Sequence, residues 1–122
     1  MSNNDSKGQE TPGSLPPAQV QQLASTVDVA VGAIVSRTLM KNEGGSVTAF
    51  AFDQGQSLSE HTAPFDALVH VIDGELTVTI AGQEHSLASG DAVLMPADVP
   101  HAVRAHHAAK FVLTMLKKAG NG

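Results

Sequence analysis

Apolar and polar residues alternate over short stretches along most of this chain, which is the pattern of β-strands rather than of helices. Residues 47–52 show it plainly, because Val47, Ala49 and Ala51 fall on one face of a strand while Phe50 and Phe52 fall on the other. A nearly continuous apolar run at 67–72 fits a strand that is buried on both faces. Further strands are predicted at 34–40, 76–80, 84–87, 92–95, 101–105 and 111–116.

Short turn sequences separate these stretches. Asn42-Glu43-Gly44-Gly45, Asp73-Gly74 and Ala81-Gly82 are typical of hairpin turns. Roughly eight or nine short strands at regular spacing predict an all-β sandwich or barrel, formed by residues 34–118. Residues 18–33 are predicted to be an N-terminal lead-in segment. Residues 1–17 are rich in Ser, Asn, Gly, Pro and Gln and are predicted to be a disordered tail.

Composition narrows the classes of partner. The chain has 122 residues, enough for one domain, and its 7 Lys and Arg against 12 Asp and Glu give a net charge of −5. This balance argues against nucleic acid as a partner, since phosphate backbones are bound by clustered basic residues. No apolar run approaches the roughly 20 residues of a membrane span, and the N-terminus lacks the apolar stretch of a secretory signal. The sequence therefore predicts a cytoplasmic protein without membrane or nucleic-acid partners, and the absence of Cys excludes disulfides and thiolate chemistry.

Histidines are the candidate functional residues, and the chain has six of them: His61, His70, His85, His101, His106 and His107. Three of these, at 85, 106 and 107, lie in or near predicted hairpin turns and are expected on the surface. Two others lie in longer motifs. One motif is Gly55-Gln-Ser-Leu-Ser-Glu-His61-Thr-Ala63, followed by Ala67 and Gly74, and the other is Gly90-Asp-Ala-Val-Leu-Met-Pro96-Ala-Asp98-Val-Pro-His101.

The two segments resemble the two motifs of the cupins, which are small jelly-roll barrels. The first cupin motif reads Gly, five residues, His-x-His, three or four residues, Glu, six residues, Gly. The second reads Gly, five residues, Pro-x-Gly, two residues, His. The resemblance covers roughly residues 34–116. Within it, residues 60–69 and 95–103 resemble more specifically a group of short bacterial cupins. It implies an all-β, double-stranded β-helix (jelly-roll) cupin barrel, and a homodimer, because small cupins commonly pair through sheet edges and N-terminal strands.

The resemblance also implies a site for one metal ion, held by two His and a Glu from the first motif and one His from the second. His61 and His101 stand at matching positions, whereas Ala63 replaces the second His and Ala67 replaces the Glu. Two imidazoles alone make a weak site for a divalent ion. With a third ligand, the site would suit a divalent transition metal such as Fe, Mn, Ni, Zn or Cu.

Asp66 and His70 are the candidates for that third ligand. They share strand parity, so both would face the cavity or both would face away from it. In the simplest register Ala67, Val69 and Val71 face inward, and a slip of one residue would reverse this. The alternative for Asp66 is a role in a turn beside Pro64. The alternative for His70 is a strand residue at an interface or hydrogen-bonded to a neighbour.

Three functions are compatible with these residues. The leading hypothesis is a metal-dependent protein that binds or converts a small organic molecule, as a dioxygenase, isomerase or lyase, with no catalytic residue assigned. The alternative is a metal-free cupin that binds or senses a ligand with a degenerate metal site. A third reading is a structural dimerisation module. The other inward positions, among them Met95 and either Met115 or Leu116, are apolar, so the cavity would suit a small hydrophobic or aromatic ligand.

Overall fold

The computed structural model describes residues 14–118. Strands dominate this range, and the one helical element is a short 3₁₀ turn, η1 (Leu23–Ser25). The strands are β1 (Ile34–Asn42), β2 (Gly45–Phe52), β3 (Ser57–His61), β4 (Phe65–Asp73), β5 (Glu75–Ile80), β6 (Gln83–Ala88), β7 (Ala92–Met95), β8 (His101–Arg104) and β9 (Ala109–Lys117). Most of the predicted tail, residues 1–13, lies outside the described residues. No helix within residues 14–118 is long and apolar enough to cross a membrane.

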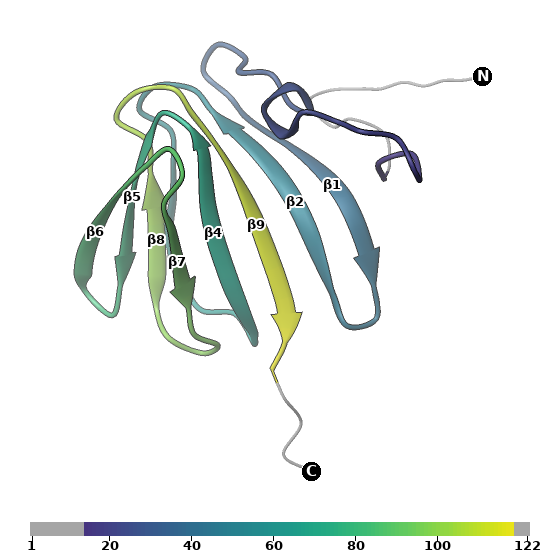
Figure 1. Ribbon diagram of the computed structural model, residues 1–122. Coiled ribbons are helices and arrows are strands. Elements are labelled where there is room, and N and C mark those ends of the chain that lie inside the picture. Colours follow the sequence, from purple (N-terminus) through teal and green to yellow (C-terminus); the bar gives the residue numbers. More distant parts are fainter. Residues whose placement is uncertain (1–13, 119–122) are drawn as a thin grey trace.

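The strands form two antiparallel sheets that face each other (Figure 1). One has the strand order β1-β2-β9-β4-β7 and the other the order β3-β8-β5-β6. This arrangement confirms the predicted all-β jelly-roll. The sequence pattern did not predict β3 as a strand, because its side chains are mostly exposed and show no apolar alternation.

The space between the sheets holds the main core. Phe50 and Phe52 of β2 face inward and meet Phe111 of β9, with ring centroids 5.1 Å and 5.2 Å from that ring. The largest fully buried side chains of this core are Phe52, Phe111, Leu76, Val69, Val71 and Val78. The alternation predicted for residues 47–52 is therefore the alternation found.

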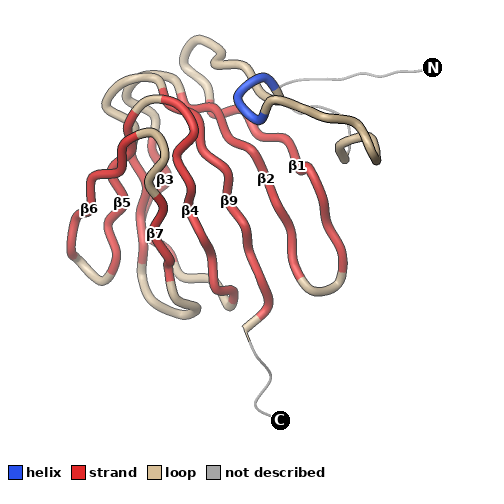
Figure 2. Tube along the Cα trace, in the orientation of Figure 1, coloured by secondary structure: helices blue, strands red, loops and turns tan. Residues whose placement is uncertain are grey.

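The lead-in segment covers the outward face of β1 and β2 (Figures 1 and 2). It closes a second apolar cluster, separate from the main core, whose buried members are Val27, Val35, Leu39, Ala49 and Ala51. The contacts begin just before this segment, in the last residues of the predicted tail, where the Leu15 N–H donates to the carbonyl oxygen of Leu39 at 2.9 Å and the Leu15 side chain packs against the cluster. The Lys110 ammonium fixes the short helix by donating to the carbonyl oxygen of Ala24 at 2.6 Å.

Gly74, which ends the first motif, connects β4 to β5 with a φ of +79°. A Cβ at this position would lie 2.7 Å from the carbonyl oxygen of Ala108. Both the left-handed backbone and this close approach require glycine. The motif glycine therefore belongs to the fold rather than to the site.

Candidate functional site

His61 and His101 meet between the two sheets. They lie on neighbouring strands, β3 and β8, and are direct partners in the strand register. Their ring centroids are 4.4 Å apart with the ring planes at 71°. His101 is only 6% exposed, whereas His61 is exposed, so the site opens to solvent on the His61 side.

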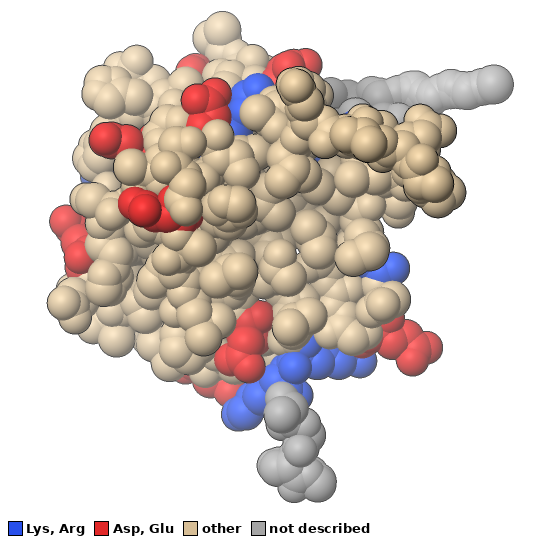
Figure 3. All heavy atoms as spheres, viewed as in Figure 1, with Lys and Arg blue, Asp and Glu red and all other residues tan. Residues whose placement is uncertain are grey.

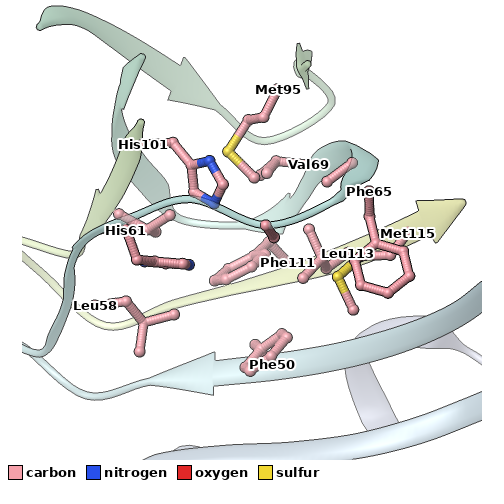
Figure 4. A pocket seen from close by; sticks show the side chains of 13 residues that line it. Phe50, Leu58, His61, Phe65, Val69, Met95, His101, Phe111, Leu113 and Met115 are labelled. Carbon is pink, nitrogen blue, oxygen red and sulfur yellow. The ribbon is translucent and has the colours of Figure 1, made fainter. Parts of the chain in front are cut away.

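Backbone carbonyls fix the tautomer of both imidazoles. The Nδ1 atom of His61 lies 2.7 Å from the carbonyl oxygen of Ser59, and that of His101 lies 3.0 Å from the carbonyl oxygen of Val99. A carbonyl oxygen can only accept, so each Nδ1 carries the proton. In this tautomer each Nε2 atom has a free lone pair, and Figure 4 shows both rings turned toward the cavity.

The cavity around the two rings has a volume of about 60 Å³. This volume is large enough for a few water molecules. Apart from the imidazoles, every lining side chain is apolar: Phe50, Leu58, Ala63, Phe65, Ala67, Val69, Met95, Val103, Phe111, Leu113 and Met115. The lining has no Asp, Glu, Lys or Arg. It offers two hydrogen-bond acceptors in surroundings of low polarity, where electrostatic interactions are strong.

Asp66 lies outside this cavity. Its carboxylate accepts the Ala97 N–H at 2.9 Å, so it ties the start of β4 to the loop between β7 and β8. That loop contains Val99, the hydrogen-bond partner of His101. Asp66 therefore supports the site through the backbone and does not reach into it.

His70 also lies outside the cavity. The register found for β4 is the one with Ala67, Val69 and Val71 buried in the core, which turns His70 to the outward face. There it is half-buried, between Ala92 of β7 and Val112 of β9. The structure thus brings together two of the four residues predicted for the site. Among residues 14–118 no group of three or more His, Cys, Asp or Glu side chains is placed to hold a metal ion.

Two methionines also line this cavity, and the sequence pattern indicated no role for them beyond apolar lining. Met95 and Met115 are the register partners of Ala67, on β7 and β9 respectively. Ala67 stands where the first cupin motif has its Glu. The pairing of β4 with β9 joins strands far apart in sequence, so local patterns carry no signal for it.

The family-model comparison decides the family of this chain. The model described as "Cupin domain" matches residues 49–116, which include both histidines of the site. The chain belongs to the cupin family. This cupin is therefore one of a family of small-molecule-binding proteins, and the sequence prediction of the family is confirmed.

Solved structures similar to this cupin agree. A conserved protein of unknown function from Streptococcus pyogenes matches with a TM-score of 0.82 and 30% identity, over 88% of this chain and 95% of that one. A cupin superfamily protein from Desulfitobacterium hafniense matches with a TM-score of 0.81 and 25% identity, over 87% and 97%. A Cupin 2 conserved barrel domain protein from Leptotrichia buccalis is 36% identical with a TM-score of 0.74, over 77% of this chain and 46% of that one. The comparison with curated proteins gives no match.

Proposed function

We propose that this cupin binds a small organic molecule with an apolar body and one hydrogen-bond donor at its head. The observation that carries the proposal is the state of the two imidazoles, whose Nδ1 atoms are both engaged by backbone carbonyls. The cavity therefore presents two Nε2 acceptors and no side-chain donor in an apolar lining. An O–H or N–H head donates to one of these two acceptors, whereas the lining offers a carboxylate no Lys or Arg.

The size of the cavity limits what enters it. Its volume of about 60 Å³ is smaller than the roughly 150 Å³ of an apolar cavity that holds benzene. The head and a few carbon atoms fit beside the imidazoles. The rest of a larger ligand extends past His61, because this ring is exposed at the open side.

A comparison of phenol with toluene tests this function, because the two differ by a hydroxyl in place of a methyl group. We expect titration calorimetry to show phenol binding about fivefold more tightly, the effect of a neutral hydrogen bond worth about 1 kcal/mol. His61→Phe with His101→Phe keeps the ring volume and should abolish the preference. His70→Phe is the matched control on the outward face and should retain it. Equal binding of both molecules to the unaltered protein would reject the proposal.

A divalent catalytic metal, which the cupin motifs imply, does not fit the residues of this site. His61 and His101 supply two neutral nitrogen ligands, and Ala63 and Ala67 occupy the other two ligand positions of the motif. Catalytic sites of this kind use at least three protein ligands. A divalent charge in this apolar lining would also have no carboxylate to offset it. Ligand binding or sensing is therefore the function we propose, in place of chemistry at a divalent ion.

We also propose that this cupin forms a homodimer through the outward face of β7, β4 and β9. Leu68, Leu94 and Leu116 on these strands are 42%, 57% and 57% exposed, and Leu68 is the register partner of Leu94. The centre of the face toward the viewer in Figure 3 shows no Lys, Arg, Asp or Glu. Exposed leucines around a centre without charged side chains are typical of an interface between subunits.

Light scattering after size exclusion tests the assembly. Leu68→Asp with Leu94→Asp should convert a dimer to a monomer, because burying two unpaired carboxylates on each subunit is costly. Val31→Asp, at a side chain that is 98% exposed in the lead-in segment, is the matched control and should leave the dimer intact. A monomeric unaltered protein at all accessible concentrations would contradict the proposal.

A further inference from the structure

A second hollow lies on the outer face of the smaller sheet, which consists of β3, β8, β5 and β6. Figure 1 shows β6, β5 and β8 side by side in this sheet. The hollow has a volume of about 260 Å³, against about 60 Å³ for the cavity around the imidazoles. Its lining is mostly polar: Ser57, Ser59, Thr77, Thr79, Glu84, Arg104 and His106, with Leu58, Ala102 and Val103. The chain therefore has a polar hollow as well as an apolar cavity.

Strand alternation turns the polar side chains of the two central strands outward. Val78 of β5 and Val103 of β8 are buried in the main core. Their neighbours along each strand therefore point to the opposite face of the sheet. All four of these neighbours line the hollow: Thr77, Thr79, Ala102 and Arg104. The pattern that builds the core thus also sets out a polar surface on the outer face.

Ala102 has the shortest side chain of this outward group. Its direct partner on β5 is Thr79, and Thr79 is in turn the partner of Glu84 on β6. Two residues along β8, Arg104 pairs with Thr77. Because longer side chains surround this alanine, the space above its methyl group stays free.

Opposite charges face the hollow from two different strands, Arg104 from β8 and Glu84 from β6. A strand spacing of about 4.8 Å and a rise of about 3.4 Å per residue place their Cα atoms roughly 12 Å apart. Among residues 14–118 neither side chain takes part in an ion pair or a side-chain hydrogen bond. A positive and a negative group are therefore both available to a ligand.

The chemistry of these two groups selects a ligand that carries both charges. A guanidinium binds a carboxylate through two parallel hydrogen bonds, and a carboxylate accepts hydrogen bonds from an ammonium group. Between them, the hydroxyl groups of Thr77 and Thr79 can donate to or accept from a polar body. The separation of Arg104 from Glu84 suits charges that lie several bonds apart, as in an ω-amino acid, rather than the adjacent charges of an α-amino acid.

We propose that this outer hollow binds a small ω-amino acid, with the carboxylate at Arg104 and the ammonium group at Glu84. The site is separate from the proposed function, since it lies on the other face of the sheet from the imidazoles. Leu58 and Val103 line both spaces, so a single layer of the sheet divides them. Each site is therefore testable without the other.

An NMR titration of the full chain with 5-aminopentanoate tests the site, because this method measures weak affinities. Pentanoate and pentylamine are comparison ligands that each lack one of the two charges. We expect 5-aminopentanoate to shift the amide signals of Thr79 and Ala102. It should bind at least about tenfold more tightly than either comparison ligand, because hydrogen bonds between charged groups are the stronger ones.

Removal of either charge should weaken the binding of 5-aminopentanoate. Arg104→Met and Glu84→Gln keep most of the side-chain volume and should each lower the affinity by about tenfold or more. Ala102→Leu fills the hollow and should abolish binding. Glu75→Gln is the matched control, since Glu75 is exposed on β5 and does not line the hollow. Its affinity should equal that of the unaltered protein.

An exchange of the two charges provides a sharper test. Arg104→Glu and Glu84→Arg each leave the hollow with charges of one sign and should each abolish binding. The double variant again has one charge of each sign, and a zwitterion can bind it in the reverse direction. It should therefore regain most of the affinity. Melting curves of all variants identify any loss of binding that comes from unfolding.

Three results would overturn the proposal. One is binding of pentanoate or pentylamine as tight as that of 5-aminopentanoate, because the hollow would then recognise a single charge. Another is the lack of detectable binding of both 5-aminopentanoate and its shorter homologue 4-aminobutanoate. The third is equal affinity of the Glu84→Gln variant and the unaltered protein. A preference for phenol over toluene that persists in any of these cases leaves the proposed function standing.

Discussion

The two faces of β2 lead to two different kinds of interior. On the outward face Ala49 and Ala51 lie under the lead-in segment, in a cluster that is apolar throughout. On the inward face Phe50 and Phe52 also pack against apolar side chains, but there the opposite sheet contributes two imidazoles and space is left around them. Both faces bury apolar side chains and so stabilise the fold. On the inward face the two imidazoles line free space, so the candidate site lies where the packing is incomplete.

The second apolar cluster, which the lead-in segment closes, should matter most for stability and least for ligand binding. Leu39 is 3% exposed in that cluster, and Leu39→Ala is expected to lower the free energy of unfolding by about 2–5 kcal/mol, through lost burial and a residual cavity. Urea denaturation measures this change. Ligand binding by the fraction that remains folded should be unaltered, and a parallel loss of affinity would show that the two interiors are coupled.

The same substitution at two alanines should have opposite effects. Ala49 is fully buried beneath the lead-in segment, so Ala49→Leu overpacks the cluster and is expected to cost about 1–3 kcal/mol of stability. Ala67 borders the cavity, so Ala67→Leu fills free space and is expected to add about 0.5–2 kcal/mol. It should also exclude ligands from the imidazole pair. Thermal unfolding and phenol titration of both variants provide the measurement, and destabilisation by both would show that the inward space is already full.

Much of this fold follows from local patterns, since the alternation at 47–52 and the motif turns correctly predicted the strands and their inward faces. The resemblance to cupin motifs also led to His61 and His101, because each occupies a fixed place in a motif. Whether a third polar side chain joins these two imidazoles in the cavity could not be predicted from the sequence. Whether Asp66 or Ala67 faces the cavity depends on a one-residue register. The approach of Met95 and Met115 to Ala67 depends on pairing between strands that are distant in the chain.

Substitutions of Asp66 test how far ligand binding in the cavity depends on a residue outside it. Asp66→Ala leaves the Ala97 N–H without its carboxylate and is expected to cost about 1–2 kcal/mol. Asp66→Asn keeps an acceptor oxygen and should lose less. Both should bind phenol nearly as well as the unaltered protein, measured by the titration calorimetry described above. If Asp66 were a ligand in the site, the Asn variant would lose binding as severely as the Ala variant.

The smallest effect on stability is expected at the edge of the second apolar cluster, where Asp53 binds the lead-in segment. Its carboxylate accepts the Gly32 N–H at 2.7 Å, and the hydrogen bonds from the Gly32 and Gln54 backbone lower the pKa of Asp53 below its ordinary value of 3.8. A carboxyl group with a lower pKa in the folded state stabilises that state above the unfolded pKa, and this contribution disappears as the pH falls through the folded pKa. The side chain is exposed, so solvent screening keeps the contribution small.

Asp53→Asn removes the titrating group and retains an acceptor oxygen. Urea denaturation should therefore show the variant slightly less stable than the unaltered protein at pH 6, with the difference narrowing or vanishing at pH 3. Exchange of the Gly32 amide should be faster in the variant at pH 6, because the neutral amide oxygen is the weaker acceptor. A difference in stability that stays constant from pH 6 to pH 3 would mean that the charge of Asp53 does not contribute to holding the lead-in segment.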